Sequence, residues 1–262
     1  MRITYRNREV KEYWAERWTD VPADSPMANK MVYPLKYAEK AVTSNDGSIL
    51  EAGCGAGRIL RYYHEQGYDI VGIDYIEVAV GKLKAIDPTL KVETGDVTQL
   101  RFADASFKYL LAFGLYHNLE QGLEVAISET ARVLQPGGCV CASFRADNTQ
   151  TRLTDWLTDR KSQQNGDPSG KVFHKMNLTR REFTRLFERA GLLVESVAPV
   201  ENMPILYKFS CFRSPRHKVF DENKARSEGY RLSSFGQLLQ RFLMSVFPNQ
   251  FCNVYVLIAR KQ

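Results

Sequence analysis

The sequence has few histidines and no paired cysteine motif, and these shortages exclude several kinds of site. It contains four histidines and five cysteines among 262 residues. No two cysteines form a C-x-x-C pair. Cys139 and Cys141 could share one side of a strand, but no histidine or cysteine pair completes a metal site with them. We therefore expect no metal, no disulfide framework, and reduced thiols in a cytoplasmic protein.

Long apolar runs are missing as well. No stretch approaches the roughly 20 residues that a membrane-spanning helix needs, and residues 1–6 carry no apolar signal region. The sequence shows no internal repeat and no low-complexity tract. With 44% hydrophobic and 25% charged residues, the composition is that of a globular protein with ample material for a core. We expect one α/β domain with insertions and no membrane contact.

The charge is unevenly spread along the chain. The net charge is +6, and the excess of lysine and arginine lies after residue 150, whereas the first 150 residues are slightly acidic. A basic half can indicate an anionic substrate or a nucleic acid. It is equally typical of an ordinary solvated surface, and the sequence contains no recognisable nucleic-acid-binding module.

The most informative stretch is a glycine-rich turn between a predicted strand and a predicted helix. The strand begins at Ile49, and the helix is expected over 58–66. Three glycines at alternate positions, Gly53, Gly55 and Gly57, connect them. Glycine lets the backbone turn sharply and approach a ligand closely because it has no Cβ. A strand, a glycine turn and a helix N-terminus together are typical of a nucleotide site.

A carboxylate follows the next predicted strand. That strand is expected over 68–73, and Asp74 ends it about 20 residues after the first glycine. At this spacing an acidic side chain reaches the ribose hydroxyls of a bound nucleotide. Asp74 could instead serve only as a cap for the helix expected over 76–86.

The glycine spacing helps to distinguish between nucleotide ligands. The dinucleotide fingerprint is G-x-G-x-x-G, whereas this chain has G-x-G-x-G, preceded by Glu51. A carboxylate here would repel a pyrophosphate, but it suits a ligand that carries an ammonium and a sulfonium. The pattern E-x-G-x-G-x-G resembles the first motif of the class I S-adenosylmethionine-dependent methyltransferases, with a core of the type 11 kind.

The resemblance implies a Rossmann-like, doubly wound α/β fold. Its seven-stranded sheet would be mostly parallel with the last strand antiparallel, and helical insertions would form a lid. Gly95-Asp96 at the end of the third strand and the run R-V-L-Q-P-G-G at 132–138 match later motifs of the family in the expected order. In place of the family's Phe-Asp before the fourth strand, this chain has Phe107-Lys108.

The resemblance also implies a cofactor, S-adenosyl-L-methionine, and its binding residues. The amino-acid end would lie at the glycine turn, the ribose on Asp74, and the adenine against Asp96 and the amide of Val97. The residues assigned to the cofactor are Glu51, Ala52, Gly53, Gly55, Gly57, Asp74, Tyr75, Asp96, Val97, Phe113 and Gly114.

Three parts of the chain are expected. Residues 1–44 would form an N-terminal helical cap, residues 45–200 and 250–262 the methyltransferase core, and residues 201–249 a helical lid. The capping-box pattern at Thr179 predicts a helix, residues 192–200 and 251–259 the last two strands, and residues 233–247 an amphipathic helix within the lid. A polar, glycine-containing stretch at 163–170 predicts a mobile loop. In the family such insertions select the acceptor, and the alternative for this one is a homodimer interface.

Two residues are candidates for chemistry on the acceptor. His117 follows the fourth strand, and its side chain titrates near neutrality, so it could act as a general base. Tyr116 could orient the acceptor. His117 could equally be a hydrogen-bonded loop histidine, and His174 could enter the acceptor pocket from its own loop.

We therefore expect a methyltransferase that transfers a methyl group to an O, N or C atom of a small organic acceptor by in-line displacement. An enzyme acting on RNA is the first alternative, because the second half of the chain is basic. An NAD-dependent oxidoreductase and a non-catalytic cofactor-binding scaffold are the others.

Overall fold

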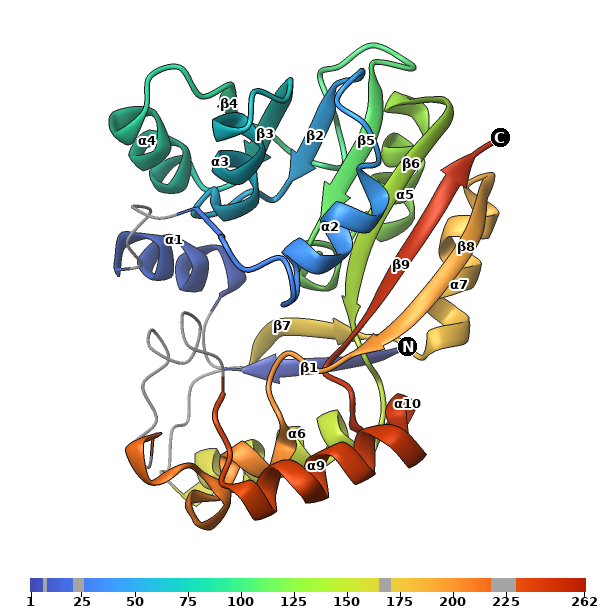
Figure 1. Ribbon diagram of the computed structural model, residues 1–262. Coiled ribbons are helices and arrows are strands. Elements are labelled where there is room, and N and C mark those ends of the chain that lie inside the picture. The colour runs from blue at the N-terminus through green and yellow to red at the C-terminus, as the bar shows by residue number, and fades with distance from the viewer. Residues whose placement is uncertain (7–8, 21–25, 165–170, 218–229) are drawn as a thin grey trace.

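The computed structural model describes residues 1–6, 9–20, 26–164, 171–217 and 230–262. Its centre is a seven-stranded sheet in the order β4-β3-β2-β5-β6-β9-β8 (Figure 1). The strands are β2 (Ile49–Ala52), β3 (Ile70–Asp74), β4 (Val92–Thr94), β5 (Phe107–Ala112), β6 (Leu134–Arg145), β8 (Leu192–Val200) and β9 (Val254–Lys261).

The strand directions are those expected from the sequence. β2 pairs in parallel with both β3 and β5, and β5 pairs in parallel with β6. β9 runs antiparallel to β6 on one side and to β8 on the other. The predicted fold class, a mostly parallel sheet with an antiparallel last strand, is confirmed.

Helices cover both faces of this sheet because its central strands are apolar on both sides. Leu50 and Ala52 of β2 pack into a core with α5 and α7, whereas Ile49 packs into the opposite core with α2, α3 and α4. These helices are α2 (Leu35–Ala41), α3 (Arg58–Glu65), α4 (Glu77–Ile86), α5 (Leu123–Val133) and α7 (Arg180–Arg189). The predicted capping box is present, because Thr179 accepts from the amide of Glu182 while the Glu182 carboxylate accepts from the amide of Thr179.

A second layer lies beyond the carboxyl ends of the parallel strands (Figure 1). It contains a two-stranded antiparallel sheet of β1 (Arg2–Arg6) and β7 (Val172–Asn177). Its helices are α6 (Thr149–Gln164), α9 (Ser234–Val246) and α10 (Pro248–Phe251). Helix α1 (Val10–Asp20) lies on the same side of the main sheet, below α3 and α4 (Figure 1).

This layer corrects three expectations from the sequence. Residues 1–44 are not a purely helical cap, because residues 2–6 form a strand that pairs with β7. The first two residues of the predicted loop, Gln163 and Gln164, belong to helix α6. The last strand of the main sheet begins at Val254 rather than 251, because Pro248 starts the short helix α10. Residues 165–170 of the predicted loop and residues 218–229 of the predicted lid lie outside the described residues.

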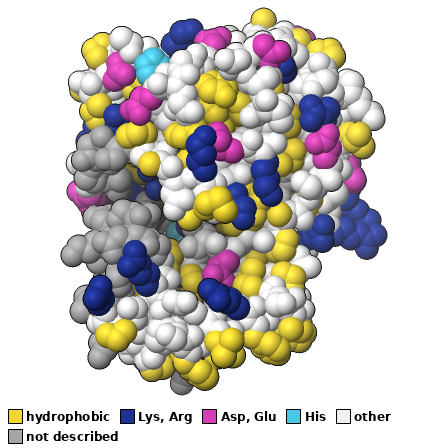
Figure 2. Space-filling model, viewed as in Figure 1, with side chains coloured by type: hydrophobic (Ala, Val, Ile, Leu, Met, Phe, Trp, Pro, Cys, Tyr) yellow, Lys and Arg dark blue, Asp and Glu magenta, His cyan; other side chains and the backbone are white. Residues whose placement is uncertain are grey.

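The two layers leave a hollow between them, which the space-filling view shows from one side (Figure 2). Because ligands of open α/β sheets bind beyond the carboxyl ends of the strands, a ligand site is expected in this hollow. Within the described part of the chain, no helix is long and apolar enough to cross a bilayer.

Candidate active site

The hollow is a cleft of about 1780 Å³ that reaches from the glycine turn to the second layer. Its walls include the ends of β2, β3 and β5 on one side and residues of α1, α6 and β7 on the other. Ligand pockets generally have volumes of roughly 300–1,000 Å³. The cleft is therefore large enough for two ligands side by side.

The glycine turn has the backbone conformation that its sequence predicts. Gly53, Gly55 and Gly57 have φ angles of +73°, +52° and +67°, a region that glycine enters without steric strain. The amides of Gly53 and Cys54 donate to the carbonyl of Ile73 at 2.8 and 3.0 Å, which ties the turn to the end of β3. Gly57 is the N-cap of α3.

Asp74 fixes the turn from the neighbouring strand. One carboxylate oxygen accepts from the amide of Gly55 at 2.8 Å and the other from the amide of Ile76 at 2.9 Å. Burial raises the pKa of Asp74, while these two amides lower it. The side chain lines the cleft with 8% of its surface exposed. Each oxygen can still accept a second hydrogen bond, so the position suits a ribose hydroxyl.

Glu51 is a buried carboxyl group with an unused oxygen. The residue is 5% exposed, and its Oε2 has no hydrogen-bond partner among the described residues. Burial raises the pKa of Glu51 to about 8, although the cation of Arg58 opposes this shift. A buried carboxyl at the glycine turn with one oxygen free of hydrogen bonds to the described residues fits an ammonium group. This observation supports the match between the turn and the amino-acid end of S-adenosylmethionine.

The residues expected around the adenine also line the cleft. Asp96 accepts from the amide and the hydroxyl of Thr98, at 2.8 and 2.7 Å, through the same oxygen Oδ1. Tyr75 lies on the cleft wall with the ammonium of Lys11 4.5 Å from its ring centre. Val97 is on the same wall.

Four further assigned residues divide into two groups. Phe113 and Gly114 line the cleft, and the Gly114 amide donates to the hydroxyl of Ser143 at 2.9 Å. Ala52 and Gly57 do not line it, because Ala52 belongs to the core of the sheet and Gly57 begins α3. Their contribution is to the shape of the turn.

His117 lines the cleft from a single 3₁₀ turn at Tyr116–Asn118. The side chain is buried, and its Nδ1 has no hydrogen-bond partner among the described residues. Burial lowers the pKa of His117 well below 6.5, and the cations of Lys175 and Arg145 lower it further. The imidazole is therefore neutral and has a nitrogen free to accept a proton. Among the described residues, no hydrogen bond to Nδ1 supports the interpretation of His117 as a hydrogen-bonded loop histidine.

Tyr116 faces the other way, which corrects the role expected for it. The side chain is fully buried, and its hydroxyl shares a hydrogen bond of 2.6 Å with the hydroxyl of Thr130 on α5. Its ring packs edge to face with that of Phe187. Because Tyr116 belongs to the core beneath the loop and is not on the cleft wall, it cannot orient an acceptor.

The sequence analysis missed three polar residues on the far wall of the cleft. Arg145 ends β6, Gln150 lies on α6 and Lys175 on β7, and all three line the cleft with His117. Only the pairing of β1 with β7 and the position of α6 bring them there. The neighbouring His174 does not line the cleft. Among the residues that the structure describes, no cluster of three or more histidine, cysteine or acidic side chains could hold a metal.

Comparison with known proteins agrees with this geometry. A family profile described as "Methyltransferase domain" matches residues 50–142. The "Probable S-adenosylmethionine-dependent methyltransferase" of Mycolicibacterium smegmatis is 31% identical over 152 residues, which cover 58% of this chain and 54% of that protein. The chain thus spans about half the length of this curated relative.

Solved structures share the fold across most of the chain. An S-adenosylmethionine-dependent methyltransferase from Methanosarcina mazei superposes with a TM-score of 0.58 at 18% identity, covering 88% of this chain and 98% of its own. The [4+2]-cyclase SpnF superposes with a TM-score of 0.53 at 16% identity, covering 86% and 78% of the two chains. The family match, the strand order and the glycine turn together show that residues 50–142 form a methyltransferase domain of the class I type, whose cofactor is S-adenosyl-L-methionine.

Proposed function

We propose that this protein transfers a methyl group from S-adenosylmethionine to an O, N or C atom of a small organic acceptor. The observation that carries the proposal is the continuity of the cleft. A single space joins the free Oε2 of Glu51 and the ribose-side carboxylate of Asp74 to the neutral imidazole of His117. Cofactor and acceptor could therefore meet next to a proton acceptor.

S-adenosylmethionine supplies a methyl group bonded to a sulfonium sulfur. The acceptor atom attacks the methyl carbon in line with the carbon–sulfur bond, and the sulfur is the leaving group. Glu51 holds the ammonium end, while Asp74 and Asp96 orient the ribose and the base. Holding both reactants in a near-attack geometry can lower the barrier by roughly 7–11 kcal/mol. The stacked rings of Trp14 and Trp18, on the cleft wall, exclude water from the turn.

His117 is the general base of this proposal. Its Nδ1 would accept the proton of a hydroxyl or amine acceptor as the methyl group is transferred. A base placed in this way contributes typically 10²–10⁴-fold to a rate. The neighbouring cations would destabilise the imidazolium that forms. The proton must therefore pass on to solvent or to a bound anion.

A small acceptor is favoured over RNA because basic side chains that are candidates for acceptor contact, Arg145 and Lys175, line the inside of the cleft. The SpnF comparison shows that a cyclase also uses this fold, so turnover has to be measured. A cytoplasmic location and a homodimer are parts of the same proposal. The five cysteines are free thiols, four of them buried, and α9 carries an exposed apolar face described below.

Calorimetric titration with S-adenosylmethionine, S-adenosylhomocysteine and NAD tests the cofactor, and we expect the first two to bind and NAD not to bind. Incubation of the protein with methyl-labelled S-adenosylmethionine and a metabolite extract then tests transfer. Binding without incorporation of label would leave a scaffold, and binding of NAD alone would leave an oxidoreductase.

A further inference from the structure

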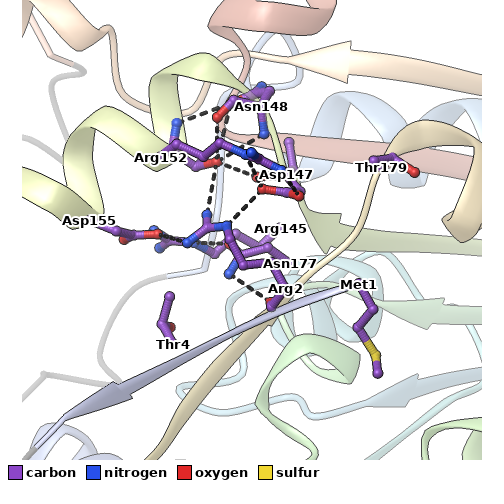
Figure 3. A network of polar contacts seen from close by, with 12 residues as sticks. Met1, Arg2, Thr4, Arg145, Asp147, Asn148, Arg152, Asp155, Asn177 and Thr179 are labelled. Carbon is purple, nitrogen blue, oxygen red and sulfur yellow. Dashed lines mark hydrogen bonds and ion pairs between the residues drawn. The ribbon is translucent and has the colours of Figure 1, made fainter.

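The far wall of the cleft carries more positive charge than its own carboxylates balance. Arg2, Arg145 and Arg152 are held by two acids of the second layer (Figure 3). Asp155 accepts from Arg145 at 2.6 Å and from Arg2 at 2.8 Å, and Asp147 accepts from Arg2 and Arg152. Both acids are thus already shared between two guanidinium groups.

The ammonium group of Lys175 forms no ion pair with a carboxylate of the described residues. The charged groups that act on it most strongly are the cations of Arg145, Arg6 and Arg17, opposed by Asp155. Burial and these cations lower the pKa of Lys175 to about 7. A cation kept in such a place without a partner is expensive unless a ligand supplies the counter-charge.

The guanidinium of Arg145 also has hydrogen-bond donors that the described residues do not use. Its Nε donates to Asn177 at 2.6 Å and one terminal nitrogen to Asp155, while Nη1 makes no hydrogen bond to the described residues. The guanidinium is therefore oriented by Asn177 and Asp155, and part of it can still bind a ligand. Gln150 of α6, which also lines the cleft, is 2% exposed, and its Oε1 has no hydrogen-bond partner among the described residues. Lys175 and Arg145 thus both keep donors for a ligand on the wall of the same cleft.

We propose that the methyl acceptor carries an anionic group, a carboxylate or a phosphate, which Lys175 and Arg145 bind at the second-layer end of the cleft. This inference rests on the proposed function, because it names the class of acceptor. An anion placed there supplies Lys175 with the missing counter-charge. Arg145 can contribute charge-assisted hydrogen bonds, which are the strong ones in a buried site.

We assign the anionic group at Lys175 and Arg145 to the acceptor and not to the carboxylate of the cofactor. The acidic groups assigned to the cofactor lie at the ends of β2, β3 and β4, and the cation that acts on Glu51 is Arg58 rather than Lys175. Lys175 and Arg145 act instead on His117, the proposed base. Among the other acids on the cleft wall, Glu201 is hydrogen-bonded to Gln240 at 2.6 Å.

Titrations of the protein saturated with S-adenosylhomocysteine test the proposal at constant ionic strength. The probes are phenyl phosphate, benzoate and, as a neutral analogue, benzyl alcohol. We expect at least one anion to bind and benzyl alcohol not to bind, and the two anions distinguish a phosphate site from a carboxylate site. Equal binding of the neutral analogue, or no binding of either anion, would overturn the proposal.

Three variants locate the binding. Lys175→Met should weaken the anion at least about tenfold, as expected for the loss of a hydrogen bond to a charged group. Lys175→Arg should retain binding, and Lys91→Met is the matched control, because Lys91 pairs with Asp69 outside the cleft. Unchanged anion affinity in Lys175→Met contradicts the proposal. A similar loss of S-adenosylhomocysteine affinity in that variant would assign the cations to the cofactor instead.

A labelled-methyl assay on an extract separated by anion exchange completes the test. Incorporation is expected in the retained, anionic fraction. Incorporation in the unretained fraction overturns the anionic acceptor while leaving methyl transfer intact. No incorporation in any fraction, together with normal anion binding, contradicts the proposed function itself, so the two failures can be distinguished.

Discussion

The indole ring of Trp18 lies against the backbone of Gly55, which brings the first helix onto the glycine turn. A Cβ built on Gly55 would come within 2.5 Å of Cζ2 of Trp18. Gly55 also donates its amide to Asp74 at 2.8 Å. One residue thus connects α1, the turn and the end of β3, and its lack of a side chain permits all three contacts.

Gly55→Ala should therefore abolish cofactor binding. The added methyl group meets Trp18, and alanine at a φ of +52° is strained by roughly 1–2 kcal/mol. Calorimetry with S-adenosylhomocysteine measures the loss. The control is Gly81→Ala in α4, where nothing lies within 4 Å of the new Cβ. That variant should bind normally and be about 0.5–1 kcal/mol more stable. Normal binding by Gly55→Ala would disprove the close approach.

Cofactor binding should release a proton from Glu51. Since the pKa of this buried acid is about 8, the group is mostly protonated at pH 7 in the free protein, and the incoming ammonium favours the carboxylate. Affinity should rise as the pH approaches 8 and fall above it, where an α-amino group with a pKa of about 7.7–8.0 loses its own charge. Calorimetry in buffers of different ionisation enthalpy measures the proton, and Glu51→Gln should remove the release and weaken binding at least about tenfold.

His117→Ala should lower the turnover number by about 10²–10⁴ while leaving the affinity for S-adenosylhomocysteine unchanged. Because the pKa of His117 lies well below 6.5, the wild-type rate at saturating cofactor should not fall between pH 8 and pH 6.5 through protonation of this residue. His64→Asn is the control, since His64 interacts with Thr89 and Asp87 outside the cleft. An unaltered rate in His117→Ala would remove the base from the mechanism.

Lys175 should make stability depend on pH. The charged groups that act on it are Arg145, Arg6, Arg17 and Asp155, and the lysine itself acts on His117 and His174. Its folded pKa, about 7, lies below the ordinary 10.5, so between these values the unfolded chain binds the extra proton. The free energy of unfolding should consequently rise with pH over that window.

Lys175→Met removes this dependence, because no cation has to be buried. At pH 6.5 the variant should be more stable than the wild type, by on the order of 2–4 kcal/mol, and the difference should shrink by pH 9.5. Urea unfolding at the two pH values measures it. A wild-type protein that is as stable as Lys175→Met at pH 6.5 would show that the lysine is already neutralised.

The outer face of α9 predicts self-association. Phe235, Leu238, Phe242 and Val246 are between 50% and 68% exposed along this one helix. Exposed apolar patches of this kind generally mark interaction sites. We expect a dimer in sedimentation experiments and a monomer for Phe242→Glu, with cofactor binding intact. Leu193→Glu, which alters an exposed apolar residue on β8, is the control. A monomeric wild type would end the homodimer interpretation.

The core of this fold could be predicted from the sequence because its signals are local. The strand from Leu192 to Val200 and the capping box at Thr179 are as expected. Asp74 and the glycine turn also meet as predicted, since parallel neighbouring strands place their carboxyl ends at one edge. In each case the deciding residues are close in the chain or on adjacent strands.

The second layer could not be predicted in the same way. Residues 2–6 pair with residues 172–177, far away in the chain, and neither segment has a turn or an alternating pattern that points to the other. The direction in which Tyr116 points depended on the packing of α5 and α7 beneath its loop.

The sequence by itself determined the strand–turn–helix unit, the mostly parallel sheet and the position of Glu51, because backbone conformation and apolar periodicity are written into short stretches of residues. Only the tertiary structure decided which polar side chains of the second layer face the cleft. Arg145, Gln150 and Lys175 come from a strand end, a helix and an edge strand, and the packing of the second layer against the sheet brings them to the same cleft as His117.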